Sequence, residues 1–326
     1  MPRRADADDL RWMTAAAALA ERARPGSTPN PGVGAIIVKD GKVVARGWTQ
    51  PGGRPHAEAM ALRAAGEQAR GGTLFVTLEP CAHRSSRGPA CADQVAEAGL
   101  SRVVIGMRDP DPRTAGDGMA IMAQSGIVVE LLQIDAISLG LSGHAMHQRF
   151  SRPHVTLKLA LSLDGCIATA GGESRWITGD AARAHTHRER ARADAILVGG
   201  GTLRADRPRL DVRLPGLENR APERWVLTRG EAPEGWRALP SPEAVGDMGD
   251  VRYLFVEGGA GAAAAFLRAD LVDRLLIYRA PILIGGGVPG VGDIGLSTLA
   301  DAHGRWRRED IRTLGPDTLE IFNRTR

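Results

Sequence analysis

The sequence predicts two α/β domains, one on each side of residue 150. Strand-like and helix-like runs alternate along the whole chain, which is the pattern of sheets covered by helices. The 326 residues are enough for two hydrophobic cores. Ser151-Arg152-Pro153 separates a helix-like run from a new series of strand-like runs, so we predict domains over residues 1–150 and 151–326.

The first domain is expected to begin with a helix that Asp8 or Asp9 caps and that Pro25-Gly26 ends. The proline-rich loop 28–34 then constrains the chain ahead of two strands joined by the turn Asp40-Gly41. In chain order the predicted elements are strands at 35–38 and 43–48, a helix after His56, a strand at 73–78, a helix after Cys91, a strand at 102–107, a helix from Asp117, a strand at 127–131 and a helix over 135–150.

The second domain repeats this alternation. Two of its predicted strands run into glycine-rich turns, at 199–202 and 257–261, and a helix follows each turn. The stretch 229–250 is the only loosely composed segment. In chain order the predicted elements are strands at 155–161 and 166–169, a helix at 180–192, strands at 195–198, 225–228 and 253–256, an alanine-rich helix, and strands at 275–280 and 318–323.

The composition is that of an ordinary soluble globular protein, with 43% hydrophobic and 25% charged residues. The net charge of +4 does not predict nucleic-acid binding, because the arginines are dispersed and only 4% of residues are aromatic. No run resembles a signal peptide or a membrane span, and three cysteines provide no disulfide framework. We therefore expect a cytoplasmic protein that binds neither nucleic acid nor membranes.

Four residues of the first domain predict a catalytic zinc site. His56 offers a nitrogen ligand, and Cys81 and Cys91 offer thiolates, so three ligands leave the fourth tetrahedral position open to water. Glu58 follows the histidine by two residues and suits the proton shuttle of a deaminase. The order His-x-Glu, Pro-Cys and a second cysteine is the signature of the zinc-dependent nucleobase deaminases.

Any one of these residues alone would more often belong to a core than to a metal site. The joint pattern, with Pro80 directly before Cys81, favours zinc. A structural zinc would need a fourth ligand, and the nearby His83 is expected to be a loop residue instead. Cys166 lies far along the chain in a strand-like stretch and is expected to be a small core residue.

Three other features of the sequence are candidates for binding or catalysis. The glycine-rich turns of the second domain can receive a phosphate or cofactor on backbone amides or can be simple tight turns, and neither contains Gly-x-Gly-x-x-Gly. Asn30 can present its amide to a substrate heterocycle or can serve the turn alone, and we take it as a candidate substrate contact. Lysine occurs only at Lys39, Lys42 and Lys158, and Lys158 alone lies within a predicted strand.

These motifs, in this order, resemble the bifunctional deaminase/reductase family of riboflavin biosynthesis over nearly the whole chain. In the first domain the resemblance rests on Asn30-Pro31-x-Val33-Gly34, His56-Ala57-Glu58, Glu79-Pro80-Cys81 with Cys91, and Asp109-Pro110-x-Pro112 followed by Ala115-Gly116. In the second domain it rests on Lys158-Leu159, Ser162-Leu163-Asp164-Gly165, Gly172-Glu173-Ser174-x-Trp176-Ile177-Thr178, Ala205-Asp206-x-Pro208, Val212-Arg213 and Val256-Glu257-Gly258-Gly259.

The resemblance implies a three-layer α/β/α domain of the cytidine-deaminase type, followed by an α/β domain of the dihydrofolate-reductase type. The first would use Zn²⁺ to hydrolyse the 2-amino group of 2,5-diamino-6-(5-phosphoribosylamino)pyrimidin-4(3H)-one. The second would use NADPH to reduce the ribosyl chain to a ribityl chain. The resemblance also implies a small-molecule substrate and a homo-oligomer, a dimer or tetramer, formed through the reductase domain.

Matched residue by residue, the resemblance makes His56, Cys81 and Cys91 the zinc ligands and Glu58 the proton shuttle. The implied substrate contacts in the second domain are Ser174, Arg190, Leu210, Arg213 and Glu257. The implied NADPH contacts are Ala160, Trp176, Thr202, Asp206, Gly259, Ala260 and Gly261. Lys158 is the only lysine of the second domain, where all other basic residues except histidine are arginine. We predict that it contacts a substrate hydroxyl or donates a proton, and a guanidinium, with its far higher pKa, cannot donate a proton.

The chain departs from the family pattern in loop length and at single residues. Nine residues separate Cys81 from Cys91, one more than usual, so substrate contacts from residues 84–87 are not predicted. The stretch 229–250 is much shorter than usual, as if a strand and a helix were missing, but Asp206 and Glu257-Gly258-Gly259 persist, so we expect the reductase to function. The single departures are Asp111 for a pyrimidine-reading asparagine, Arg207 for an acid or amide, and Arg229 for a small residue near the cofactor.

Three alternative functions make different predictions. A nucleic-acid deaminase, of the kind that acts on tRNA, would use the second domain as an RNA-binding module and would bind RNA in a salt-sensitive way. A deaminase with an inactive reductase domain would release ammonia without consuming NADPH. A non-catalytic zinc protein with a scaffold domain would release no ammonia, and Glu58→Gln would then change nothing.

Overall fold

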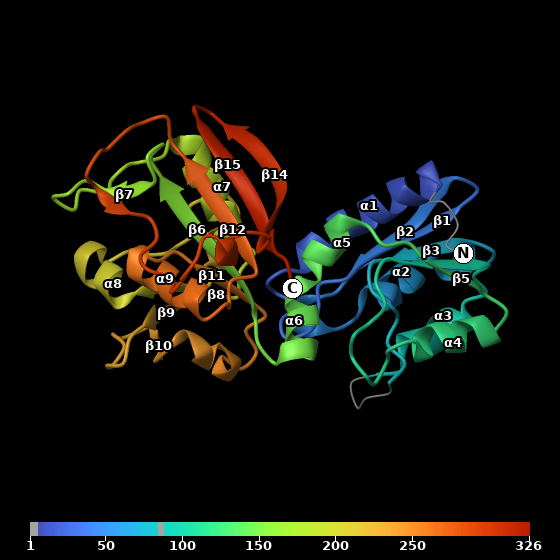
Figure 1. The fold of residues 1–326 in the computed structure, drawn as a ribbon. Helices are drawn as coiled ribbons and strands as arrows, with labels where there is room; N and C mark the ends of the chain where they lie inside the picture. The colour runs from blue at the N-terminus through green and yellow to red at the C-terminus, as the bar shows by residue number, and fades with distance from the viewer. Residues whose placement is uncertain (1–5, 84–87) are drawn as a thin grey trace. The chain divides into compact units, whose positions relative to one another are not determined.

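The computed structural model describes residues 6–83 and 88–326, so residues 84–87 of the Cys81–Cys91 loop lie outside the described part (Figure 1). The chain forms two compact units, residues 1–151 and 152–326. Unit 1 contains one sheet of five strands, and unit 2 contains one sheet of eight strands and one of two. The predicted fold class, two successive α/β domains, is confirmed.

Unit 1 is built on a five-stranded sheet in the order β2-β1-β3-β4-β5. The pairs β1/β2 and β1/β3 are antiparallel, whereas β3/β4 and β4/β5 are parallel. The parallel half requires crossover helices, which is why helices alternate with strands from β3 onward. The strands are β1 (Gly34–Lys39), β2 (Lys42–Trp48), β3 (Thr73–Val76), β4 (Arg102–Ile105) and β5 (Val128–Leu131).

Helices cover both faces of this sheet and give the predicted three-layer α/β/α arrangement. Figure 1 shows α1 and α5 on one face and α2, α3 and α4 on the other. The helices are α1 (Ala7–Ala23), α2 (Ala57–Ala65), α3 (Cys91–Glu97), α4 (Asp117–Gln124), α5 (Asp135–Gly140) and α6 (Ser142–Phe150). The prediction of a single helix over 135–150 is wrong, because α5 ends at Gly140, the buried Leu141 leaves helical geometry, and α6 begins at Ser142.

Two glycines let the helices of unit 1 approach the sheet closely. A Cβ at Gly34 would lie 2.0 Å from the Ala16 carbonyl oxygen, so α1 packs directly on β1. A Cβ at Gly47 would lie 2.2 Å from the Ala57 carbonyl oxygen, which brings the first turn of α2 against β2. This second contact fixes the start of α2, where His56 is the N-cap residue.

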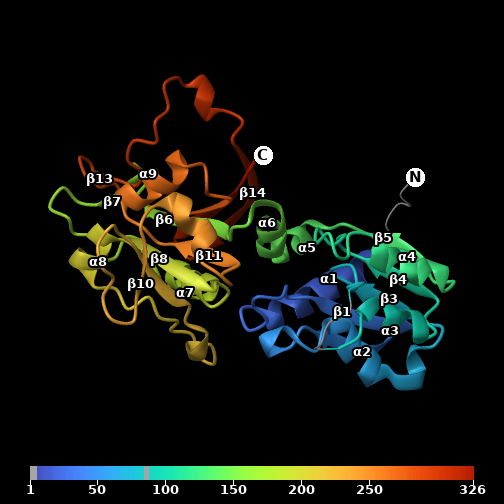
Figure 2. The same ribbon diagram turned by 90° about the horizontal axis from the view of Figure 1, so that it is seen from below.

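Unit 2 contains an eight-stranded sheet in the order β10-β9-β8-β11-β6-β12-β15-β14 and a two-stranded sheet of β7 and β13. The strands are β6 (His154–Leu161), β7 (Cys166–Ala168), β8 (Ala195–Gly199), β9 (Glu223–Leu227), β10 (Arg237–Leu239), β11 (Tyr253–Val256), β12 (Arg274–Arg279), β13 (Val288–Pro289), β14 (Trp306–Leu314) and β15 (Asp317–Arg324). The helices are α7 (Asp180–Arg190), α8 (Gly200–Asp206) and α9 (Ala260–Arg268). Figure 2 shows α9 and α7 on opposite faces of the large sheet.

Three strands of unit 2 were missed from the sequence. β10 lies inside the stretch 229–250, which also holds a short 3-10 helix at Pro242–Asp247, so this segment is less irregular than expected. β14 pairs antiparallel with β15 at the edge of the sheet. Most of its side chains are exposed, so its sequence lacks the alternation of apolar and polar residues that identifies a half-buried strand. β13 has only two residues.

The alternation of side chains along β6 decides which residues reach the functional face. Val155, Leu157, Leu159 and Leu161 belong to the core beneath α9. Lys158 is offset by one residue, so its side chain emerges on the opposite face, beside α7. Because β6, β8 and β11 are parallel neighbours, their carboxyl ends meet at one edge, where ligands gather in open α/β sheets.

No described helix combines the length and the apolar character that crossing a membrane would require.

Candidate active sites

The three predicted zinc ligands converge in unit 1. His56 Nδ1 lies 3.6 Å from Cys81 Sγ and 3.4 Å from Cys91 Sγ, and the candidate ligand atoms of the three residues all lie within 4.8 Å of one another. They come from separate elements, since His56 caps α2, Cys81 lies in the loop after β3 and Cys91 begins α3. Only the fold brings the three together.

This donor set fits a zinc ion. One imidazole and two thiols are ligands that zinc prefers, and three protein ligands are the number found in catalytic sites. Hydrogen bonds with Cys91 and His56 lower the pKa of the Cys81 thiol, against the effect of burial, which favours the thiolate that binds metal. His83, the candidate fourth ligand, is not part of the cluster, and its Nδ1 lies 3.4 Å from Thr114 Oγ1.

Glu58 lies in the first turn of α2 and is buried, with 3% of its surface exposed. Burial raises the pKa of its carboxyl to about 7, while the nearby charge of His56 opposes the rise. A carboxyl with a pKa near neutrality can both accept and donate a proton, which is what a general acid–base residue must do. The charge of His56 acts on the Glu58 carboxyl, and Glu58 follows His56 by two residues at the start of α2, so it lies on the element that carries the histidine ligand.

Two other residues that the sequence singled out in unit 1 are Asn30, which lies beside the cluster, and Asp111. Asn30 Nδ2 donates to the Gly53 carbonyl oxygen at 3.0 Å and lies 3.3 Å from His56 Nε2. Asp111 is buried, and its carboxylate accepts hydrogen bonds from Arg113, from Nη2 at 2.5 Å and from the backbone N–H at 2.9 Å. These bonds lower the pKa of Asp111, so it acts as a hydrogen-bond acceptor.

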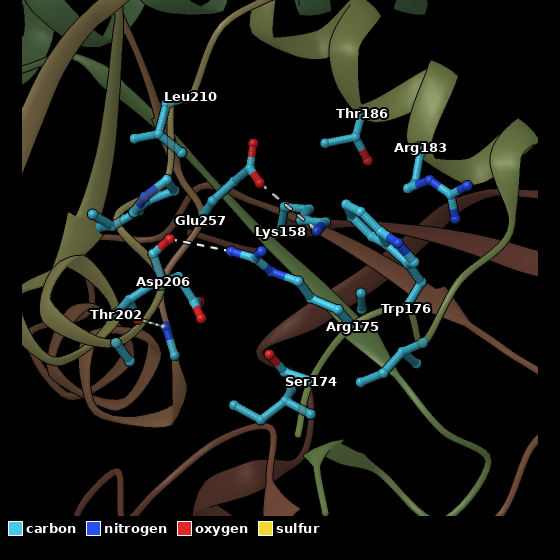
Figure 3. A pocket seen from close by; sticks show the side chains of 18 of the residues that line it. Lys158, Ser174, Arg175, Trp176, Arg183, Thr186, Thr202, Asp206, Leu210 and Glu257 are labelled. Atoms are coloured by element: carbon cyan, nitrogen blue, oxygen red, sulfur yellow. Dashed lines mark hydrogen bonds and ion pairs between the residues drawn. The ribbon is translucent and has the colours of Figure 1, made fainter. Parts of the chain in front are cut away.

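Unit 2 has a cavity of about 680 Å³ at the carboxyl ends of β6, β8 and β11 (Figure 3). Most of the residues predicted for the second site line it. They are Lys158, Ala160, Ser174, Trp176, Arg190, Thr202, Asp206, Leu210, Arg213, Glu257 and Gly259. Ala260 and Gly261 do not line this cavity, because they form the first turn of α9 just beyond the glycine-rich turn.

Charged side chains form the centre of this pocket. Arg190 donates to the Glu257 carboxylate from Nε at 2.5 Å and from Nη2 at 2.9 Å. Lys158 Nζ lies 3.8 Å from the same carboxylate (Figure 3). Burial would raise the pKa of Glu257, but the charges of Arg190 and Lys158 hold it below its ordinary value. Burial lowers the pKa of Lys158, and the Glu257 charge opposes that change.

Several lining residues were missed from the sequence. His187 lies one turn before Arg190 on α7, and its Nδ1 donates to the Asp211 carbonyl oxygen at 3.1 Å. Arg175 Nη2 donates to the Asp206 carbonyl oxygen at 3.1 Å and so bridges two walls of the pocket (Figure 3). The spacing of His187 and Arg190 on one helical face could have identified the first, whereas no local pattern indicates the second.

Comparison with known families supports two enzymatic units. The model of the cytidine and deoxycytidylate deaminase zinc-binding region matches residues 6–107. The model of the RibD C-terminal domain matches residues 153–241 and 241–319. The two segments of this second match meet at residue 241, inside the stretch expected to be short.

Similar proteins span almost the full chain. The riboflavin biosynthesis protein RibD of Escherichia coli K12 is 38% identical over 360 residues, covering 95% of this chain and 97% of that protein. RibD of Mycobacterium tuberculosis H37Rv is 40% identical over 308 residues, covering 89% and 90%. The structure of Acinetobacter baumannii RibD superposes with a TM-score of 0.85 at 33% identity and covers 98% of this chain and 99% of that one.

A structure from Thermotoga maritima, described as a diaminohydroxyphosphoribosylaminopyrimidine deaminase/5-amino-6-(5-phosphoribosylamino)uracil reductase, gives a TM-score of 0.84 at 29% identity, with 98% and 99% coverage. The predicted family resemblance is thereby confirmed across both units. With a deaminase-type ligand cluster in unit 1, a polar pocket in unit 2 and relatives matched nearly end to end, the chain belongs to the RibD family of riboflavin biosynthesis proteins.

Proposed function

We propose that the two reactions of this RibD-family enzyme take place at the two sites described above, one in each unit. The chain is a bifunctional deaminase and reductase of riboflavin biosynthesis, and its cofactors are Zn²⁺ and NADPH. The observation that supports the deaminase assignment most directly is the set of one imidazole and two thiols within 4.8 Å.

In unit 1, His56, Cys81 and Cys91 would hold the zinc ion, and Asn30 would contact the pyrimidine of 2,5-diamino-6-(5-phosphoribosylamino)pyrimidin-4(3H)-one. Zinc, when bound, supplies the Lewis acidity that activates a water molecule near neutral pH. Glu58 takes a proton from the attacking water and delivers it to the 2-amino nitrogen, which then leaves as ammonia. The raised pKa of Glu58 matches this double role, because the carboxyl exchanges a proton readily near pH 7.

In unit 2, the pocket would hold the deaminated substrate beside NADPH. Ser174, Leu210 and Arg213 line the pocket, and we assign them to the substrate together with Arg190 and Glu257. We assign the cofactor to the residues on and around the glycine-rich turns. These are Ala160, Trp176, Thr202, Asp206 and Gly259, with Ala260 and Gly261 following on α9.

Lys158 is proposed as the proton donor of the reductase or as a contact to a substrate hydroxyl. Reduction of the ribosyl carbon adds a hydride to that carbon and a proton to the ring oxygen that leaves it, and NADPH supplies the hydride when bound. Lys158 is partly buried, with its Nζ 3.8 Å from the Glu257 carboxylate; burial lowers its pKa, and the charge of Glu257 opposes that change. An ammonium in this environment can give up a proton, whereas a guanidinium cannot.

The test is to supply the diaminopyrimidine phosphate together with NADPH and to follow ammonia release and NADPH oxidation separately. We expect both signals, with ammonia released first. A zinc chelator should stop ammonia release and leave NADPH oxidation on previously deaminated substrate unchanged. Ammonia release without NADPH oxidation would refute the reductase assignment, and neither signal would refute the proposed function.

We also propose that the enzyme is a cytoplasmic homo-oligomer, a dimer or tetramer formed through unit 2. Exposed apolar side chains support such an interface, since Leu163 and Leu283 are 52% and 75% exposed and the Leu163 N–H donates to the Ile282 carbonyl oxygen at 2.8 Å. The free thiols of the three cysteines suit a reducing compartment. Sedimentation velocity of the wild type and of Leu283→Asp would test the interface, because a monomer in both cases contradicts it.

A further inference from the structure

One loop of unit 1, residues 109–116, is tied to the segment that carries Cys81. The buried carboxylate of Glu79, two residues before Cys81, accepts hydrogen bonds from the backbone N–H groups of Asp109 at 3.1 Å, Gly116 at 2.9 Å and Met119 at 3.1 Å. Asp109 and Gly116 are the two ends of the loop, and Met119 lies in the first turn of α4, directly after it. The Glu79 carboxylate therefore holds the loop next to the segment that carries Cys81.

Close packing leaves this loop little freedom. A Cβ at Gly118 would lie 2.2 Å from the Pro80 carbonyl oxygen, so α4 presses directly on the residue before Cys81. In the middle of the loop, Thr114 Oγ1 lies 3.4 Å from His83 Nδ1 and 3.5 Å from the Ala82 backbone N–H. The loop therefore contacts the segment that bears Cys81 at both of its ends and at Thr114.

His144 supports the loop from the other side. Its Nε2–H donates to Asp109 Oδ1 at 2.8 Å, and both side chains are buried. The same oxygen of Asp109 accepts the Asp111 backbone N–H at 2.9 Å. Because a carboxylate is only an acceptor, the imidazole must carry its proton on Nε2 in this contact. His144 belongs to α6, which contributes no residue to the deaminase motif.

The loop that packs on the Cys81 segment also carries two charged residues. Asp111 is 5% exposed and is held by Arg113 through its backbone N–H and its guanidinium. The hydrogen bond to Arg113 lowers the pKa of Asp111, and the charge of His83 adds to that effect; the bond to Asp111 raises the pKa of Arg113, and the charge of Cys81 adds to it. The orientation of Asp111 depends on the bond from its own N–H to Asp109.

We infer that His144 is a positioning residue of the deaminase: its Nε2–H fixes the Asp109 carboxylate, which in turn orients Asp111 and Arg113 toward the pyrimidine substrate. The inference rests on the proposed deaminase function. If the His144 imidazole is removed, the buried Asp109 oxygen loses one of its two hydrogen-bond donors. The Asp109 carboxylate can then rotate and no longer holds the Asp111 backbone N–H in a fixed position. Substrate binding should suffer more than the chemical step.

The decisive comparison uses His144→Leu, which removes the donor, and His144→Gln, whose amide can place an N–H near the Nε2 position. We expect His144→Leu to lower kcat/KM for ammonia release by roughly tenfold, mostly through KM, and His144→Gln to restore much of it. Zinc content and NADPH oxidation on deaminated substrate should match the wild type, because the ligands and unit 2 are untouched. His147→Leu, the same change one turn along α6, is the matched control and should leave KM unchanged.

If His144→Leu yields no folded protein, His144→Gln against His144→Asn decides, since both are polar and only glutamine reaches the Nε2 position. Equal KM values for these two variants, or a wild-type KM in His144→Leu, would overturn the inference. Loss of zinc in His144→Leu would overturn it as well, because that result assigns the residue to general stability. Ammonia release by the wild type tests the proposed function independently of all these comparisons.

Discussion

Arg190 binds the carboxylate of Glu257 through two hydrogen bonds, at 2.5 and 2.9 Å, in the centre of the unit 2 pocket. The pair joins α7 to the carboxyl end of β11, two elements that lie far apart in the sequence. It also places a fixed negative charge 3.8 Å from Lys158. The pKa of Lys158 therefore depends on a salt bridge that two other residues make. Two variants test the role of the lysine and its dependence on that salt bridge.

Lys158→Arg should impair the reductase while the deaminase keeps working. A guanidinium preserves the charge beside Glu257, but its pKa is too high for it to release a proton. We expect NADPH oxidation on deaminated substrate to fall by about 10²- to 10⁴-fold, the usual contribution of a general acid. Ammonia release by the same preparation is the internal control. Unchanged NADPH turnover in this variant would exclude Lys158 as the proton donor.

Glu257→Gln should shift the pH dependence of the reductase. The Glu257 charge raises the pKa of Lys158 against the effect of burial, so its removal lowers that pKa further. The protonated lysine is then lost at a lower pH, and the basic limb of the kcat/KM profile for NADPH oxidation should move to lower pH. A profile that keeps its shape and position, with only a lower plateau, would mean that Glu257 does not control the lysine.

Glu58→Gln should abolish ammonia release and leave the metal in place. Glutamine has nearly the same shape as glutamate but cannot carry a proton, so the rate should fall by about 10²- to 10⁴-fold. Zinc content should equal that of the wild type, because Glu58 is not among the three clustered ligands. Wild-type ammonia release by this variant would contradict the shuttle assignment, and NADPH oxidation on deaminated substrate shows that the protein is folded.

Asp273→Asn should destabilise unit 2. Asp273 is buried and accepts bonds from Arg152 at 2.7 and 2.9 Å and from the Val155 N–H at 2.9 Å. Removal of its charge leaves the buried Arg152 without this compensating charge, which costs roughly 3–5 kcal/mol of the free energy of unfolding at neutral pH. Asp250→Asn is the control, because Asp250 is exposed and lies 3.9 Å from Arg252, and such pairs contribute about 0–1 kcal/mol.

The stability difference between wild type and Asp273→Asn should depend on pH in a defined direction. Burial would raise the pKa of Asp273, but the bond to Arg152 and the nearby charges hold it below its ordinary value. The stabilisation is therefore complete above the ordinary pKa of an aspartate, about 4, and is lost as the pH falls through the lower pKa of the folded state. Urea unfolding at several pH values measures this; a difference that grows toward acid would contradict it.

Much of the architecture was accessible from local sequence patterns. Apolar runs and turn residues predicted most strands and helices within a few residues, because burial in a sheet or beneath a helix imposes short repeats on the chain. The failures occurred where that signal is weak. β14 is largely exposed, β13 has only two residues, and the helix expected over 135–150 breaks at Leu141, whose burial no local repeat indicates.

The candidate sites likewise contain residues that the sequence could select and contacts that it could not. His56, Glu58, Cys81 and Cys91 were selected from ligand chemistry and spacing, and Lys158 from its rarity among arginines. The contacts of His144 with Asp109 join residues 35 positions apart, and those of Arg190 with Glu257 join residues 67 positions apart.

The sequence by itself thus determined the fold class, the family and the kinds of chemistry available, because these follow from short-range periodicity and from the properties of single side chains. Only the tertiary structure decided which buried groups support the reacting ones. Glu79, His144 and Arg190 reach their partners through the order of strands in each sheet, and the desolvation that shifts the pKa of Glu58 and Lys158 arises only when distant segments close around them.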